Sequence, residues 1–164
     1  MKCLLAPVAV VAALAIAGCG SSSTLSTEQF NGLQDQGKQF AKSMETVGAD
    51  ASSCAAGATA GKGANTPPDL SAVKTCLASA LGKAGDGLTK ITNYTDDLAD
   101  EVDGDCSTDL KALSAAMADV NAIFAKAETQ ARDGDLVKMQ GTLKSIKSTE
   151  ISSSGAAAEK ACKS

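Results

Sequence analysis

Residues 70–102 read LSAVKTCLASALGKAGDGLTKITNYTDDLADEV, and apolar residues recur in them at steps of three or four. This recurrence places the apolar side chains on one face of an amphipathic helix. Gly82, Gly85 and Gly87 interrupt it, and each glycine costs about 1 kcal/mol relative to alanine inside a helix. Because the apolar phase is kept on both sides of them, we predict one helix kinked between Gly82 and Gly87, with a break into two helices as the alternative. The apolar positions are Leu70, Val73, Leu77, Leu81, Ala84, Leu88, Ile91, Leu98 and Val102.

Two more long stretches show the same recurrence. The first covers residues 27–56 and begins at a capping box, in which Ser26 and Gln29 each satisfy the other's backbone N–H. The other covers residues 107–132 and is followed by Gly134, the residue type that most often ends a helix. Both stretches are therefore predicted to be long amphipathic helices.

The last part of the chain predicts a fourth helix. Asp135 can cap it, and its apolar positions continue as far as Ile146. Serines and a glycine at residues 152–155 interrupt the pattern, and residues 156–162 are helical by propensity alone. Short connections join the last three helices. We therefore expect residues 26–164 to form one all-α domain, an antiparallel up-down four-helix bundle with two disulfides.

Composition excludes several classes of function. The chain has 164 residues, a net charge of −4, and neither histidine nor tryptophan. Without histidine it cannot hold a Ser-His-Asp triad, a Cys-His nucleophile pair or a Glu-x-x-His di-iron site. A pI of about 4.8 and few aromatic residues argue against binding to nucleic acid. We therefore expect a protein that is not an enzyme and that uses no cofactor.

The first residues have the pattern of an export signal. Lys2 precedes an apolar run over residues 4–17, which is too short to span a bilayer as a helix. The run ends in Ile16-Ala17-Gly18-Cys19 and is followed by glycine and serines. This segment resembles the lipobox of bacterial lipoproteins, in which an aliphatic residue and two small residues precede a cysteine.

The resemblance implies that residues 1–18 are a signal peptide, removed by cleavage before Cys19. The Cys19 sulfur would carry a diacylglycerol, and the new amino terminus a further acyl chain such as palmitate. Residues 19–25 would then be a lipidated tether, and the protein would lie on the extracytoplasmic face of the cell membrane. Two alternatives remain: a signal peptide cut nearby that leaves Cys19 without lipid, and an uncleaved anchor segment.

Four cysteines lie within the predicted domain: Cys54, Cys76, Cys106 and Cys162. An even number in an exported domain predicts two disulfides, and the spacing lacks the close pairs that are typical of zinc sites. In an up-down bundle, Cys54 and Cys76 lie at one end and Cys106 and Cys162 at the other. The predicted topology therefore selects Cys54–Cys76 and Cys106–Cys162 among the three connectivities.

Acidic residues gather between positions 96 and 109, which contain no basic residue. Asp100, Asp103 and Asp105 are the candidates there for binding a hard cation such as calcium. Aligning Gly104 with the glycine of an EF-hand loop puts non-ligating residues at the first and last ligand positions, so that motif is excluded. We expect a solvated acidic end, partly neutralised by Lys160 and Lys163, and no metal.

Two other features have simple interpretations. The loop over residues 57–65 is rich in glycine, and we expect either a plain connection or a loop that contacts a partner. Tyr94 lies near the apolar face of its helix, which favours a buried tyrosine with a hydrogen-bond partner rather than a catalytic phenol.

Together these patterns predict a lipid-anchored extracytoplasmic envelope protein, a non-enzymatic binding or scaffolding module. Its expected partners are the membrane, through the lipid on Cys19, and another envelope protein. The alternative is a carrier that holds a small apolar ligand between its helices, favoured by the glycines of residues 82–87 and by the many small residues on the same apolar face.

Overall fold

The computed structural model describes residues 24–57, 70–146 and 148–163, and these residues are helical throughout apart from short connections. No strand occurs among them. The predicted all-α class is therefore confirmed. The helices are α1 (Thr27–Gly57), α2 (Leu70–Glu101), α3 (Gly104–Asp133), α4 (Leu136–Leu143) and α5 (Ser148–Cys162).

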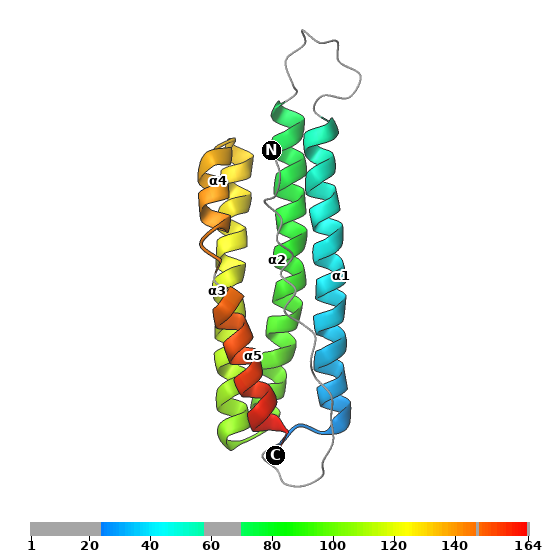
Figure 1. Cartoon of the computed structure of the whole chain (residues 1–164), viewed down its shortest axis with the longest axis vertical. Coiled ribbons are helices and arrows are strands. Elements are labelled where there is room, and N and C mark those ends of the chain that lie inside the picture. Colours follow the sequence, from blue (N-terminus) through cyan, green and yellow to red (C-terminus); the bar gives the residue numbers. More distant parts are fainter. Residues whose placement is uncertain (1–23, 58–69, 147, 164) are drawn as a thin grey trace.

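The three long helices lie side by side and alternate in direction (Figure 1). The backbone of α2 packs against both α1 and α3, and both α4 and α5 pack along α3. Among the described helices, α1 packs its backbone against α2 alone. The observed packing is thus a series in which α2 and α3 are central and the other three helices flank them.

The predicted fourth helix is two helices, so that part of the prediction is wrong in detail. After α4, the chain forms short turns in which Ser145 N–H donates to Thr142 O and Ile146 N–H donates to Leu143 O. The Ser145 hydroxyl also donates to Thr142 O at 2.6 Å. This side-chain hydrogen bond competes with the backbone hydrogen bond that would continue the helix. Helix α5 then covers the serine-rich residues at which the sequence pattern was expected to stop.

Helix α2 runs without a break across its glycines, so the alternative of two helices is wrong. The glycines allow both neighbouring helices to come close. A Cβ at Gly85 would lie 3.0 Å from Asn121 Oδ1 of α3, and one at Gly87 would lie 3.3 Å from the Phe40 ring of α1. The propensity lost at these glycines is therefore offset by close packing on two sides of α2.

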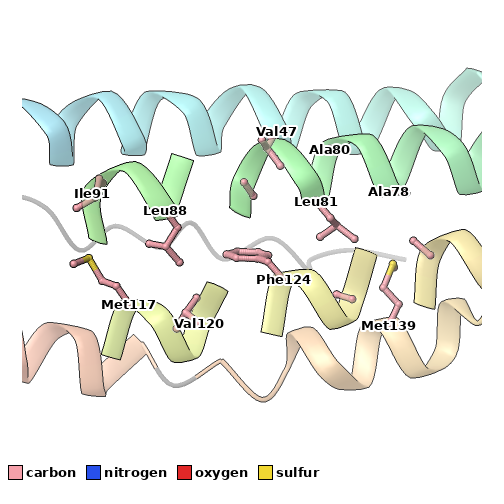
Figure 2. Close-up of a cluster of buried hydrophobic side chains, with 13 residues drawn as sticks. Val47, Ala78, Ala80, Leu81, Leu88, Ile91, Met117, Val120, Phe124 and Met139 are labelled. Atoms are coloured by element: carbon pink, nitrogen blue, oxygen red, sulfur yellow. The ribbon is translucent and has the colours of Figure 1, made fainter. Parts of the chain in front are cut away.

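The core has two parts. The larger cluster extends along α2 and α3, with Val47 of α1 and Met139 of α4 joining it (Figure 2). Much of it is alanine: Ala84, Ala127 and Ala131 are completely buried, and such small residues allow α2 and α3 to approach closely. The smaller cluster lies near the α2–α3 connection, where Leu110 is completely buried.

Both predicted disulfide pairings are confirmed. Cys54–Cys76 joins the end of α1 to the start of α2, with 5.6 Å between the Cα atoms. Cys106–Cys162 joins the start of α3 to the end of α5, with 4.7 Å between the Cα atoms. We call the first of these ends the far end and the second the near end, because the described chain begins beside the second (Figure 1).

Candidate functional site

The predicted lipid site, Cys19, lies outside the described residues, and so do the predicted signal peptide and most of the tether. The described chain starts at Thr24, and Leu25 packs against the smaller core cluster at the near end. None of the helices in the described ranges is long and apolar enough to cross a membrane. Lipidation stays a prediction, and the described chain begins at the near end of the helices.

The start of α1 is held by the capping box that the sequence predicts. Ser26 N–H donates to Gln29 Oε1 at 2.8 Å, and Gln29 N–H donates to Ser26 Oγ at 3.2 Å. Gln29 Nε2 also donates to Glu101 Oε2 at the end of α2. The start of α1 is therefore attached to the end of α2.

The predicted hydrogen bond of Tyr94 is confirmed, but the side chain is only partly buried, where a buried tyrosine was expected. Its hydroxyl donates to the Gln29 carbonyl at 3.4 Å and lies directly over Gly32. Partial burial raises the pKa of the phenol above its usual value, and the carboxylates of Glu101 and Glu28 raise it further. Tyr94 therefore holds α1 against α2 as a neutral donor.

The acidic residues of the near end are not brought together as a metal site. Asp100 pairs with Lys111 of α3 at 3.3 Å, and both side chains are exposed. Asp103 stands at the start of α3 without a side-chain capping bond, and Asp105 is exposed. Within the part of the chain that the structure describes, no three Cys, Asp or Glu residues are placed to hold a metal ion.

Lys160 and Lys163, which were expected to neutralise part of the acidic residues between positions 96 and 109, form no ion pair with them in the described part of the chain. Lys163, directly after the end of α5, pairs with Glu159 of that helix and lies over the Phe30 ring, 5.9 Å from its centroid. It therefore attaches α5 to α1. Lys160 is exposed, and no ion pair between it and the acidic residues is observed within the described ranges.

A first groove, which we call the α2–α3 groove, has a volume of about 470 Å³ and lies over Gly82 and Gly85. Its polar side chains largely bind one another. Asn121 Nδ2 donates to Thr89 Oγ1 at 2.8 Å, and Arg132 pairs with Glu128 at 2.5 Å. This groove thus marks where the glycines of α2 admit polar side chains from α3.

A second groove lies between α3 and α4, and we call it the α3–α4 groove. It has a volume of about 420 Å³ and is open to solvent. Gln130 lines it, and the Oε1 atom of this residue is buried in the protein without a hydrogen-bond partner among the described residues. Its polar lining residues are Lys126, Gln130, Lys138, Thr142 and Ser145, and Gly141 lines it as well.

Sequence reasoning missed the α3–α4 groove. The only sequence signal for it is that Lys126 and Gln130, and separately Lys138 and Thr142, are four residues apart and so share a helix face. That signal is weak, because solvated helix faces show the same spacing. The other predicted contact site, the loop over residues 57–65, lies outside the described residues except for its first residue, Gly57.

Comparisons with known proteins supply no family. No protein-family model matches the chain, and neither a curated protein nor a solved structure matches it. The functional argument therefore depends on the sequence pattern and on the geometry described above.

Proposed function

We propose that this protein is a lipid-anchored extracytoplasmic envelope protein that acts as a non-enzymatic binding or scaffolding module. The observation that carries the proposal is the segment Ile16-Ala17-Gly18-Cys19, which follows a positively charged Lys2 and an apolar run. The two disulfides support it, because such bonds persist in oxidising compartments outside the cytoplasm. The absence of histidine from the whole chain supports a non-enzymatic role.

The position of the tether supports a defined orientation on the membrane. Leu25 is six residue steps after Cys19, so the tether reaches at most about 20 Å when extended. Leu25 packs at the near end. A lipid on Cys19 would therefore hold the near end close to the membrane, and two or three acyl chains would make the attachment stable.

We infer that α4 and α5 together take the place of the fourth helix of an up-down bundle. Both pack along α3, one after the other, in the same direction (Figure 1). Helix α2 has 32 residues, which corresponds to a length of about 48 Å. A stiff rod of this length would hold the far end well away from the membrane, as a scaffolding role requires.

The carrier alternative has less support. A carrier of an apolar molecule needs an enclosed apolar cavity, since ligand sites of this kind bury most of the ligand surface. The two grooves described above are open to solvent rather than enclosed, and charged and polar residues are among the lining of both. Neither groove would bury most of the surface of an apolar ligand.

Lipidation is tested by replacing Cys19 with serine, with Cys3→Ser as the matched control in the same leader. Cell fractionation should find the Cys19→Ser protein released from the membrane and the Cys3→Ser protein retained. Mass spectrometry of the amino-terminal peptide should show acyl chains on Cys19 in the control alone. Full membrane retention of the Cys19→Ser protein, with no acylated Cys19 peptide in the wild type, would show the proposal to be wrong.

The scaffolding role is tested with a photoreactive residue at either end of the rod. Val137 at the far end is 83% exposed, and Asp103 at the near end is also exposed, so both sites tolerate a probe. Cross-linking in intact cells should join a defined envelope protein to position 137, and the probe at position 103 should give lipid adducts. Equal protein cross-links at both positions would contradict a partner held at the far end.

A further inference from the structure

We propose that one side of the helical domain binds an acyl chain of the protein's own Cys19 lipid when the protein is away from the membrane. The proposal rests on the lipidation of Cys19 proposed above and gives the same lipid a second binding place. This side lies between α1 and the pair α4 and α5, which stand on opposite sides of α2 in Figure 1. We call it the open side, and its apolar residues are Phe40 and Met44 of α1, Leu143 of α4, Ile146, and Ile151 of α5.

The open side lacks the backbone packing that closes the other sides of the bundle. In a closed up-down bundle the first helix packs against the last. Within the described residues, α1 makes no backbone contact with α4 or α5. Side chains bring the two together at the near end, where Lys163 lies over the Phe30 ring. The remainder of this side is therefore covered by side chains alone.

The side chains that cover it are apolar. The five residues of the open side come from both of its edges, pack against the larger core cluster and stay partly exposed. Phe40 and Met44 are one turn apart and so share one face of α1. Apolar residues scattered singly on a surface need no partner, whereas a contiguous apolar surface marks a binding site. The open side thus suits an apolar ligand.

The length of chain before the domain brings the Cys19 lipid to this surface. Leu25 packs at the near end, and Cys19 is six residue steps before it, which gives a reach of at most about 20 Å. Phe40 is thirteen residues after Thr27, so it lies about 20 Å along α1 from the start of that helix. A lipid on Cys19 therefore reaches either the membrane at the near end or the apolar residues midway along α1.

The tether also explains how an open surface can hold an acyl chain. A free apolar ligand needs a site that encloses it, but a chain linked to the domain binds intramolecularly. A short flexible linker gives an effective concentration on the order of millimolar, so weak apolar contacts are sufficient. Binding removes the apolar surfaces of the acyl chain and of the open side from water. The membrane competes for the same chain, so the open side is filled when the protein leaves the membrane.

The proposal is tested with the full-length lipidated protein, labelled in cells with a palmitate analogue that carries a diazirine and then freed of detergent. Mass spectrometry first shows whether Cys19 is acylated. Irradiation should then join the analogue to peptides of the same molecule that contain Phe40, Met44 or Ile151. A Cys19 without acyl chains would overturn the proposed lipidation as well. An acylated Cys19 with cross-links elsewhere, or only between copies, would overturn binding by the open side alone.

Met44→Glu and Val137→Glu form a matched pair of variants. Both place a negative charge at an apolar residue, but Val137 is 83% exposed and belongs to neither core cluster. In detergent-free buffer, light scattering should find the wild type and Val137→Glu monomeric, and Met44→Glu associated through its uncovered acyl chains. Met44→Leu keeps an apolar side chain and should behave like the wild type. An associated wild type or a monomeric Met44→Glu would overturn the proposal.

Melting temperatures separate loss of the lipid site from loss of folding. In detergent-free buffer, the lipidated wild type should melt about 5 °C or more above the released Cys19→Ser protein, because a bound acyl chain stabilises the folded state. In the Met44→Glu background this difference should vanish, whatever the melting temperature of that variant. Equal melting of the wild type and Cys19→Ser would overturn the proposal, and so would a difference that persists in Met44→Glu.

Discussion

Removing the Cys106–Cys162 disulfide should release α5 before the rest of the protein unfolds. The bond closes a loop with a sequence separation of 56, and in the chain-entropy model such a cross-link stabilises the folded state by about 4 kcal/mol. The loss of stability should be larger for α5 itself than for the protein as a whole. In the described structure the backbone of α5 packs against α3 alone, and only Ala158 and Cys162 of this helix are buried.

The matched control is removal of the other disulfide. Cys54–Cys76 closes a loop with a sequence separation of 22, and its loss should reduce the free energy of unfolding by about 3 kcal/mol. It joins α1 to α2 and makes no contact with α5. The double variant Cys54→Ala, Cys76→Ala should therefore be nearly as destabilised as Cys106→Ala, Cys162→Ala but should keep α5 in place.

Urea denaturation gives the two free energies, and native-state hydrogen exchange gives the protection of each helix. In the Cys106→Ala, Cys162→Ala protein, the amides of α5 should exchange at nearly the rate of a free chain while those of α2 and α3 stay protected. Protection of α5 at the wild-type level would refute this reasoning. Equal loss of α5 protection in the control variant would also refute it, because it would show that α5 depends on the stability of the whole protein and not on its own disulfide.

Three further outcomes are expected. Gly48→Ala should raise the free energy of unfolding by about 1 kcal/mol, because a Cβ there meets nothing within 4 Å. Gly32→Ala should lower the free energy of unfolding, because its Cβ would overlap the Tyr94 hydroxyl. Thermal melts of the two variants test both expectations. Tyr94 is the only tyrosine of the sequence, so absorbance at alkaline pH should report one phenol with a raised pKa. The stabilising contribution of the neutral Tyr94 phenol is complete below the ordinary tyrosine pKa and should be lost as pH rises through the raised pKa. The side-chain and backbone hydrogen bonds with Lys138 lower the pKa of Asp135. The protection of α4 in hydrogen exchange should therefore be complete above the ordinary carboxyl pKa and decline as pH falls through the lowered value. Asp135→Ala should remove this pH dependence.

Local features of the chain could be predicted because their physical causes are local. The capping box of Ser26 and Gln29, and the end of α3 at Gly134, follow from hydrogen bonds within one turn of the chain. Gly134 has the left-handed φ of 82° that glycine adopts without strain. The disulfide pairing was also predictable, because long antiparallel helices place cysteines at one end or the other whatever the details of packing.

The sequence by itself thus determined the all-helical class, most helix boundaries and the two cysteine pairs, since helical period, capping and helix length depend on near neighbours in the chain. Tertiary structure decided why α2 tolerates its glycines, why the last segment divides into α4 and α5, and which polar residues meet in the α3–α4 groove. The environment of Gly85 depends on Asn121, 36 positions away, and the isolation of Gln130 Oε1 depends on how α4 lies on α3. Such facts are set by distances between helices, and the period of a single helix carries no information about them.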